Sequence, residues 1–215
     1  MSLKKVFTES LRAAGRVKNL IFFYLATHTV FLIFGEWTVA RKIPGVLLMR
    51  EEQLKEIESL GYLKPLTGAL ANSLALKILY TFLFNLVFGA FLSTTITGIA
   101  FFLPYMIAVW RSFMVGALFY GQDIGPGMTV IFYGTFILEF GAYCLSSAVG
   151  TDIGLSIIWP SRKGTKSRKE ALLRAIKNGA WLYVLVILIL FVAAIWEISW
   201  LQYMGPLLKP ENIAK

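Results

Sequence analysis

Three carboxylates, one guanidinium and one amide lie within or beside long apolar stretches of this sequence. They are Asn85, Arg111, Glu139, Asp152 and Glu197. A charge near the centre of a bilayer costs about 2.5–3.5 kcal/mol on insertion scales, so such a residue has a partner or a function. Carboxylates at these positions are suited to hold a proton, a cation or a basic side chain.

Glu139 stands in the middle of the apolar stretch GTFILEFGAYCLSSAVGTD, residues 134–152. Counted from the glycine-rich turn at 121–127, Arg111 lies ~15 Å deep and Glu139 ~18 Å deep. The helices on either side of a short turn are expected to be adjacent and antiparallel. We therefore expect Arg111 and Glu139 to form a direct ion pair near the midplane. The pair either fixes the register of two helices or forms a substrate, ion or proton site, and both interpretations stay open.

The other two carboxylates are expected elsewhere: Glu197 near the outer end of the last apolar helix, and Asp152 near the inner end of the helix before it. Each is an ordinary interfacial charge or, together with Glu139, a step on a path across the membrane. Glu139 has no expected acidic partner at its own depth, which argues against an intramembrane carboxyl protease.

Motifs for hydrolysis, metal binding and nucleotide binding are absent, and the chain has one His and one Cys. We therefore expect no catalytic residue, no metal site and no cofactor, and we do not expect an enzyme.

Two rows of small and polar residues are spaced to share a helix face. One row is Thr81, Asn85, Gly89 and Ser93; the other is Glu139, Tyr143, Ser146, Gly150 and Gly154. Small residues let membrane helices approach closely, and an amide can bond across the contact. We expect the two rows to face each other and to be buried, within the chain or in a dimer.

Composition identifies the elements that position these residues. The chain has 215 residues, 57% of them hydrophobic and 15% charged, with a mean hydropathy of +0.69. Such values, with several apolar runs of about 20 residues, predict an all-α polytopic membrane bundle with about five transmembrane helices and short amphipathic surface helices. The expected spans are residues 20–39, 78–97, 102–121, 128–150 and 179–202.

The net charge of +9 is concentrated in a basic segment at 1–19 and a basic loop at 160–178. Residues 1–19 read as an amphipathic helix on the membrane surface or as a solvated tail. The positive-inside rule places both basic segments, and the N-terminus, on the cytoplasmic side of the cell membrane. We expect them to contact anionic lipid rather than nucleic acid. Residues 40–76 form an outer segment with a short amphipathic helix, and 203–215 a C-terminal tail.

Over about residues 20–202 the chain resembles the stage II sporulation protein M family of five-span membrane proteins. The resemblance rests on ILYTFLFNLVFGAFLSTTITGIA, FILEFGAYCLSSAVGTDIG, ALLRAIKNGAWL and AAIWEI. It implies that Asn85, Glu139, Gly150, Gly154 and Glu197 match family positions. The chain departs from the family at Gly134-Thr135-Phe136, where Pro-His-Gly is frequent, and at Arg111-Ser112, where Asn-Gly is frequent.

In spore formers the family member resembles a scaffold that assembles peptidoglycan-remodelling enzymes, although the family extends far beyond spore formers. Two hypotheses follow for this chain. A non-enzymatic scaffold or assembly factor would use the outer segment and the basic loop to bind protein partners or a second copy. A transporter or permease subunit would instead have a polar path through Glu139. A packed bundle favours the first hypothesis, and a cavity that reaches Glu139 favours the second.

Overall fold

The computed structural model describes residues 2–59, 64–122 and 125–204, and all its elements are helical. In chain order they are α1 (Leu3–Arg16), α2 (Lys18–Ala40), α3 (Pro44–Ser59), α4 (Lys64–Thr67), α5 (Leu74–Phe84), the π-helix η1 (Asn85–Ile96), the 3₁₀ turn η2 (Thr97–Ile99), α6 (Leu103–Phe119), α7 (Gly125–Ile158), the 3₁₀ turn η3 (Pro160–Lys163) and α8 (Arg168–Met204).

Four of these helices are long and apolar enough to cross a membrane: α2, the continuous helix Leu74–Ile99, α7 and α8. The apolar helix α6 has 17 residues and rises about 25 Å, at the short end of what spans a bilayer. The predicted all-α membrane bundle is therefore confirmed. The apolar helices occur at the five places where the sequence predicted spans.

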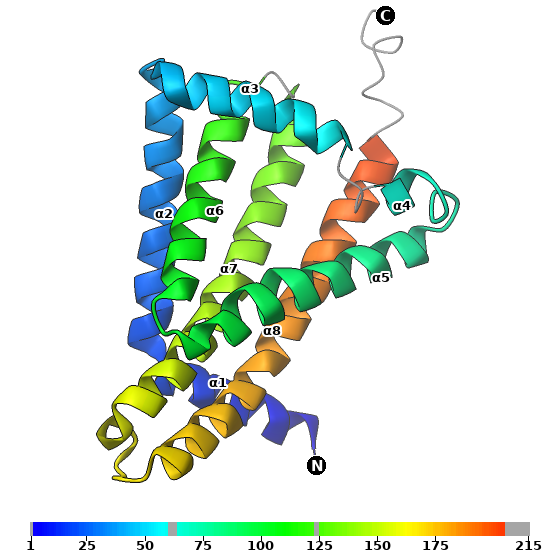
Figure 1. Cartoon of the computed structure of the whole chain (residues 1–215). Helices are drawn as coiled ribbons and strands as arrows, with labels where there is room; N and C mark the ends of the chain where they lie inside the picture. Colours follow the sequence, from blue (N-terminus) through cyan, green and yellow to red (C-terminus); the bar gives the residue numbers. More distant parts are fainter. Residues whose placement is uncertain (1, 60–63, 123–124, 205–215) are drawn as a thin grey trace, which may run out of the picture.

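The two basic segments lie at the same end of the bundle. Figure 1 shows α1 and η3 at one end, which we name the inner end, and α3 across the opposite end, which we name the outer end. At the outer end, Arg50 of α3 donates a 2.7 Å hydrogen bond to the carbonyl of Tyr120, beyond the end of α6. The outer end therefore also holds the α6–α7 connection.

Helix α7 is the centre of the bundle. It packs against α8, η1 and α2, and every residue from Ala142 to Asp152 is buried. A helix buried on all sides has neighbours all round, and the small residues of this stretch let those neighbours approach. The α5–η1 helix runs obliquely across α7 and α8 (Figure 1).

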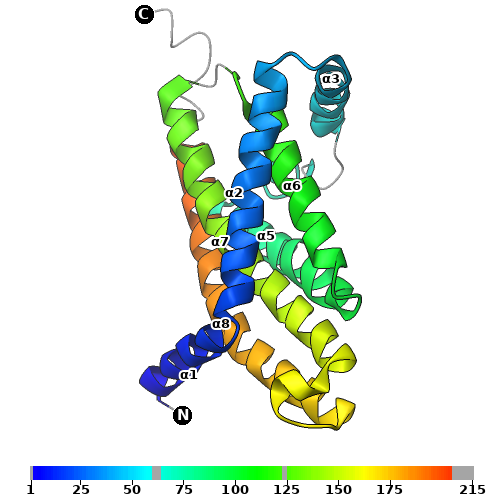
Figure 2. The ribbon, with the colours of Figure 1, turned by 90° about the vertical axis from the view of Figure 1, so that its left-hand side faces the viewer.

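Helix α6 packs mainly on α2 rather than on α7, which differs from the expected pairing of α6 and α7. Two glycines explain the preference, because a Cβ at Gly35 would lie 2.3 Å from the carbonyl oxygen of Phe113, and one at Gly116 2.1 Å from that of Leu32. Figure 2 shows α2 lying between α6 and α7. A short turn between helices does not by itself make them close packing partners.

The basic loop is shorter than predicted, since α8 begins at Arg168 within the expected loop 160–178. Ala171, Ala175 and Asn178 are buried at three- and four-residue spacing. That spacing is a helix face. The segment was predicted to be a loop because so many of its residues are charged.

Helix α1 docks on α8 through small residues. Ser10 and Ala13 are buried, and Asn178 of α8 donates a 3.3 Å hydrogen bond to the carbonyl of Ala13 and accepts one of 3.0 Å from Arg16. Two apolar side chains of α1 are not buried in this contact. Phe7 and Leu11 are about half exposed (52% and 51%). They point away from α8, as a helix lying at a bilayer surface requires.

Candidate functional site: two carboxylates between two cavities

The hydrogen-bond partner of Glu139 on the neighbouring helix is Asn85, the first residue of η1. Its Nδ2 donates a 2.5 Å hydrogen bond to Oε1 of Glu139. One helical turn further along α7, the Tyr143 hydroxyl donates a 3.4 Å bond to Oε2. Both carboxylate oxygens therefore have a donor, and each donor belongs to one of the two facing rows.

Arg111 does not pair with Glu139, and the expected direct ion pair is wrong: within residues 2–59, 64–122 and 125–204 no ion pair joins them. The guanidinium donates to the carbonyl of Gly89 at 3.2 and 3.3 Å and to the Ser93 hydroxyl at 3.1 Å. It also lies 4.2 Å from the centre of the Tyr143 ring. Tyr143 therefore stands between the two charges, with its ring toward Arg111 and its hydroxyl toward Glu139.

Gly89 makes this arrangement possible. A Cβ at this position would lie 2.6 Å from the Tyr143 hydroxyl oxygen, so a larger residue here would force the Tyr143 side chain to move. Gly89 lies in the π-helix η1, a form of helix that is often found at functional sites. Its carbonyl accepts bonds from both Arg111 and Ser93.

The two predicted rows meet at Asn85 with Glu139 and at Gly89 with Tyr143, and beyond them the contact continues through residues outside the first row. Thr94 donates a 2.7 Å bond to Ser146, next in order after the Asn85–Glu139 contact. Further along, a Cβ at Gly150 would lie 2.1 Å from the Thr94 carbonyl oxygen, and one at Gly154 2.1 Å from that of Gly98. We name this contact the η1–α7 seam.

The row on the α5–η1 helix is only half-buried at Thr81, Asn85, Gly89 and Ser93. The wider turn of the π-helix brings Thr94, Thr95 and Gly98 to the buried side instead.

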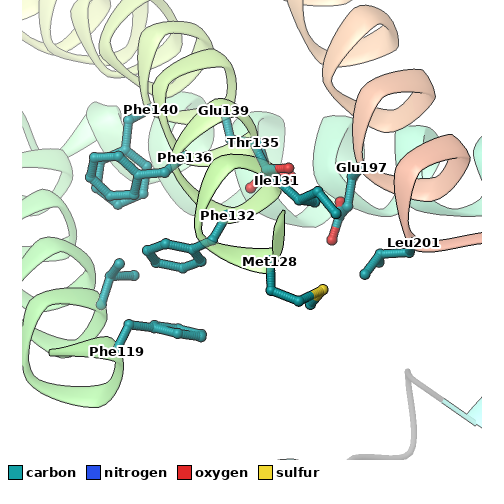
Figure 3. A pocket seen from close by; sticks show the side chains of 11 residues that line it. Phe119, Met128, Ile131, Phe132, Thr135, Phe136, Glu139, Phe140, Glu197 and Leu201 are labelled. Atoms are coloured by element: carbon teal, nitrogen blue, oxygen red, sulfur yellow. The ribbon is translucent and has the colours of Figure 1, made fainter. Parts of the chain in front are cut away.

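Glu139 and Glu197 together separate two cavities. One cavity of about 460 Å³ lies between α6, α7 and α8, and another of about 250 Å³ lies between α4, α5, α7 and α8. Both cavities are lined by both carboxylates. Figure 3 shows the side chains of Glu139 and Glu197 in the space between α7 and α8, with aromatic rings along the far wall.

Glu197 lies near the end of α8, and it lines the same two cavities as Glu139, which the sequence did not predict. Counting residues from helix ends did not bring the two carboxylates together because α7 and α8 cross obliquely. The sequence argument that Glu139 lacks an acidic partner at its depth is therefore wrong. A short connection between α7 and α8 does not predict which of their side chains meet, so the sequence held no signal for this pairing.

The charges of the site are unequal in number. Glu139 and Glu197 line the same two cavities, and Arg111 lies on the other side of Tyr143 from Glu139. This largely apolar region therefore holds two carboxylates and one guanidinium. When both carboxylates are ionised, the site carries one excess negative charge, which needs a proton or a small cation close by.

Asp152 belongs to a different part of the molecule. It is buried at the inner end of α7, where Lys163 of η3 pairs with it at 2.6 Å. The structure does not bring it to Glu139, so a chain of three carboxylates across the bundle is not formed. Its contact with Lys163 ties η3 to α7.

The pairing of His28 with Ser112 was not predicted. These buried side chains join α2 and α6 by a 2.5 Å hydrogen bond, and the His28 ring lies 4.5 Å from that of Phe140. Polar residues on two neighbouring spans were the only available signal. In the part of the chain that the structure describes, no group of three or more His, Cys, Asp or Glu side chains could hold a metal ion.

Comparison with known proteins identifies the family of this chain. A search of curated proteins and a search of solved structures found no match. The sequence model of stage II sporulation protein M matches residues 20–200, which includes both cavity-lining carboxylates. With its long apolar helices, this match makes the chain a multi-pass integral membrane protein. The chain belongs to the stage II sporulation protein M family.

Proposed function

We propose that this protein is a non-enzymatic component of membrane transport that takes up one positive charge, a proton or a small cation, at Glu139 and Glu197. The single observation that carries the proposal is that two cavities meet at these carboxylates. A scaffold needs no hollow beside its buried charges, and an apolar wall would cost less free energy.

The larger cavity supports entry from the outer end. Its lining includes Phe119 at the end of α6, Met128 in the first turn of α7 and Leu201 near the end of α8. All three lie at helix termini that meet at the outer end (Figure 1). A ligand that enters there meets Glu197 and Glu139 before it meets the η1–α7 seam.

The close packing of the η1–α7 seam favours a mechanism in which the site opens to one side of the membrane at a time, rather than a continuously open channel. Beyond Glu139, helix backbones touch at Gly98 and Gly150, which leaves no space for a ligand between them. Passage to the inner end therefore requires η1 and α7 to separate. In the proposed orientation the inner end, with α1 and its basic residues, faces the cytoplasm.

The proposal is tested by flux in proteoliposomes. Purified protein is reconstituted with a pH-sensitive or sodium-sensitive dye inside, and flux is driven by a membrane potential. We expect flux above that of protein-free liposomes, and its loss in Glu139→Gln and Glu197→Gln. Glu51→Gln, on the exposed surface of α3, is the matched control and keeps the flux. Wild-type flux equal to that of empty liposomes would contradict the proposal.

A scaffold or assembly factor is the second candidate. It is favoured by the closely packed inner half and by the exposed helix α3, which lies across the outer end and offers a surface to protein partners or to a second copy (Figure 1). Its test is cross-linking in native membranes with the exposed face of α3 altered at Glu51, Glu52 and Lys55. Partners lost in the altered protein, with no flux in the wild type, would favour this candidate.

A further inference from the structure

A second polar cavity lies at the inner end, far from the carboxylate pair. It has a volume of about 440 Å³ and is formed where α1, η3 and α8 meet. Its lining residues are Glu9, Arg16, Lys163, Arg174, Lys177, Asn178 and Trp181. Four of these seven side chains are basic.

The charges that line this cavity leave an excess of positive charge. Each nearby carboxylate already has a basic partner: Glu9 pairs with Arg12, Asp152 with Lys163 and Glu170 with Arg174, at 2.5–2.6 Å. Among the described residues, no carboxylate pairs with Arg16 or Lys177. Two cationic groups from different helices therefore remain to attract an anion.

Arg16 and Lys177 are held in different ways. Asn178 is buried and accepts a bond from Arg16, which fixes the guanidinium at the edge of the cavity while its remaining donors stay available. Lys177 is exposed on α8, one residue from Asn178. The cavity thus combines one positioned guanidinium with one movable ammonium.

The cavity lies where α8 changes from basic to apolar. Its residues Arg174, Lys177, Asn178 and Trp181 are followed on the same helix face, at three- and four-residue spacing, by Leu185, Leu188 and Val192. Leu188 and Val192 are about half exposed. The half-buried Trp181 separates the two parts, as interfacial aromatic residues do.

We propose that this cavity binds the phosphate-bearing headgroup of an anionic membrane lipid, with an acyl chain along the apolar face of α8. A soluble phosphate would use the two cations but not the adjoining apolar strip, so the combination favours a lipid. Basic pockets between membrane helices on the cytoplasmic side bind such headgroups. Because Arg16 belongs to α1, a bound headgroup joins α1 to α8 and strengthens the docking of the N-terminal helix.

The test uses the full-length protein in neutral detergent, titrated with short-chain phosphatidylglycerol. Binding is followed by native mass spectrometry. We expect clear preference over short-chain phosphatidylcholine and no competition from inorganic phosphate at equal concentration. Lys177→Gln is expected to weaken binding about fivefold, the effect of removing one basic residue near an anionic lipid.

The matched control is Lys169→Gln, which removes the same charge from an exposed position of α8 outside the cavity. Its binding is expected to equal that of the wild type. Equal weakening by both substitutions would mean diffuse surface attraction and would overturn the proposal. Equal binding of the two lipids, or displacement of phosphatidylglycerol by inorganic phosphate, would overturn it as well.

Discussion

Substitution of Gly150 by alanine tests the η1–α7 seam, on which the position of Asn85 beside Glu139 depends. The added Cβ would lie 2.1 Å from the Thr94 carbonyl oxygen and 3.0 Å from the Thr95 Cα. Both obstacles are backbone atoms, so no side-chain rotation relieves the clash. Ordinary contact begins at 3.4 Å, and η1 must therefore recede by about 1.3 Å.

The displacement of η1 from α7 lowers the free energy of unfolding by an amount that can be estimated. Overpacking of a well-packed contact costs about 1–3 kcal/mol. The movement also lengthens the hydrogen bonds that Thr94 and Thr95 donate to Ser146, at 2.7 and 3.2 Å, each worth about 0.5–1.5 kcal/mol. We expect a total loss of about 2–5 kcal/mol in the free energy of unfolding. A loss of 3 kcal/mol corresponds to roughly 6–12 °C in Tm for a chain of this size.

The assay is thermal unfolding in detergent, with Gly141→Ala as the control. Gly141 lies on the same helix, and a Cβ there would meet nothing within 4 Å. Its substitution should raise stability slightly, by about 0.5–1 kcal/mol, because alanine restricts the unfolded chain. If Gly150→Ala is as stable as Gly141→Ala, the close approach of η1 and α7 is refuted.

Three further predictions concern other parts of the structure. Cysteines introduced at Gln122 and Lys166 should react with a membrane-impermeant thiol reagent from opposite sides of the membrane; reaction from one side contradicts the arrangement of the spans. Asn178→Ala should speed amide hydrogen exchange in α1 with little change in Tm, because it removes both bonds that hold α1 to α8; unchanged exchange contradicts this role. Arg111→Met should destabilise the protein by about 2–4 kcal/mol, because it removes the bonds to Gly89 and Ser93 and the cation–π contact with the Tyr143 ring. Arg111→Lys should recover only part of that loss, since lysine lacks the planar fork, and full recovery would argue against the bonding of the guanidinium.

The sequence predicted the helices better than the contacts between them. Apolar length identifies a membrane helix because the thickness of the bilayer sets it. The same reasoning gives a residue's depth but not the direction in which its side chain points. The predicted depths therefore placed Arg111 and Glu139 in the same region, but they did not show that the Tyr143 side chain lies between the two charges.

Two features had no usable signal in the sequence. The π-helix η1 looks like an ordinary apolar helix, because its wider hydrogen-bond pattern has no composition of its own. The meeting of Glu139 and Glu197 depends on the oblique crossing of α7 and α8, which packing of whole helices decides. By contrast, the glycine rows were readable, since Gly89, Gly150 and Gly154 stand where neighbours touch.

The central claim is that Glu139 and Glu197 form one site, in which two carboxylates line the same two cavities. A double-mutant cycle measures this directly, from the unfolding free energies of the wild type, Glu139→Gln, Glu197→Gln and the double variant. Each single change relieves the repulsion between the two carboxylates, whereas in the double variant the second change has no repulsion left to relieve. The double variant should therefore be less stable than the sum of the single effects by about 1–3 kcal/mol.

The same cycle between Glu139→Gln and Asp152→Asn supplies the control, because Asp152 pairs with Lys163 at the inner end. Those two effects should add within about 0.5 kcal/mol. Additivity of the Glu139 and Glu197 substitutions within the same limit would contradict a shared site.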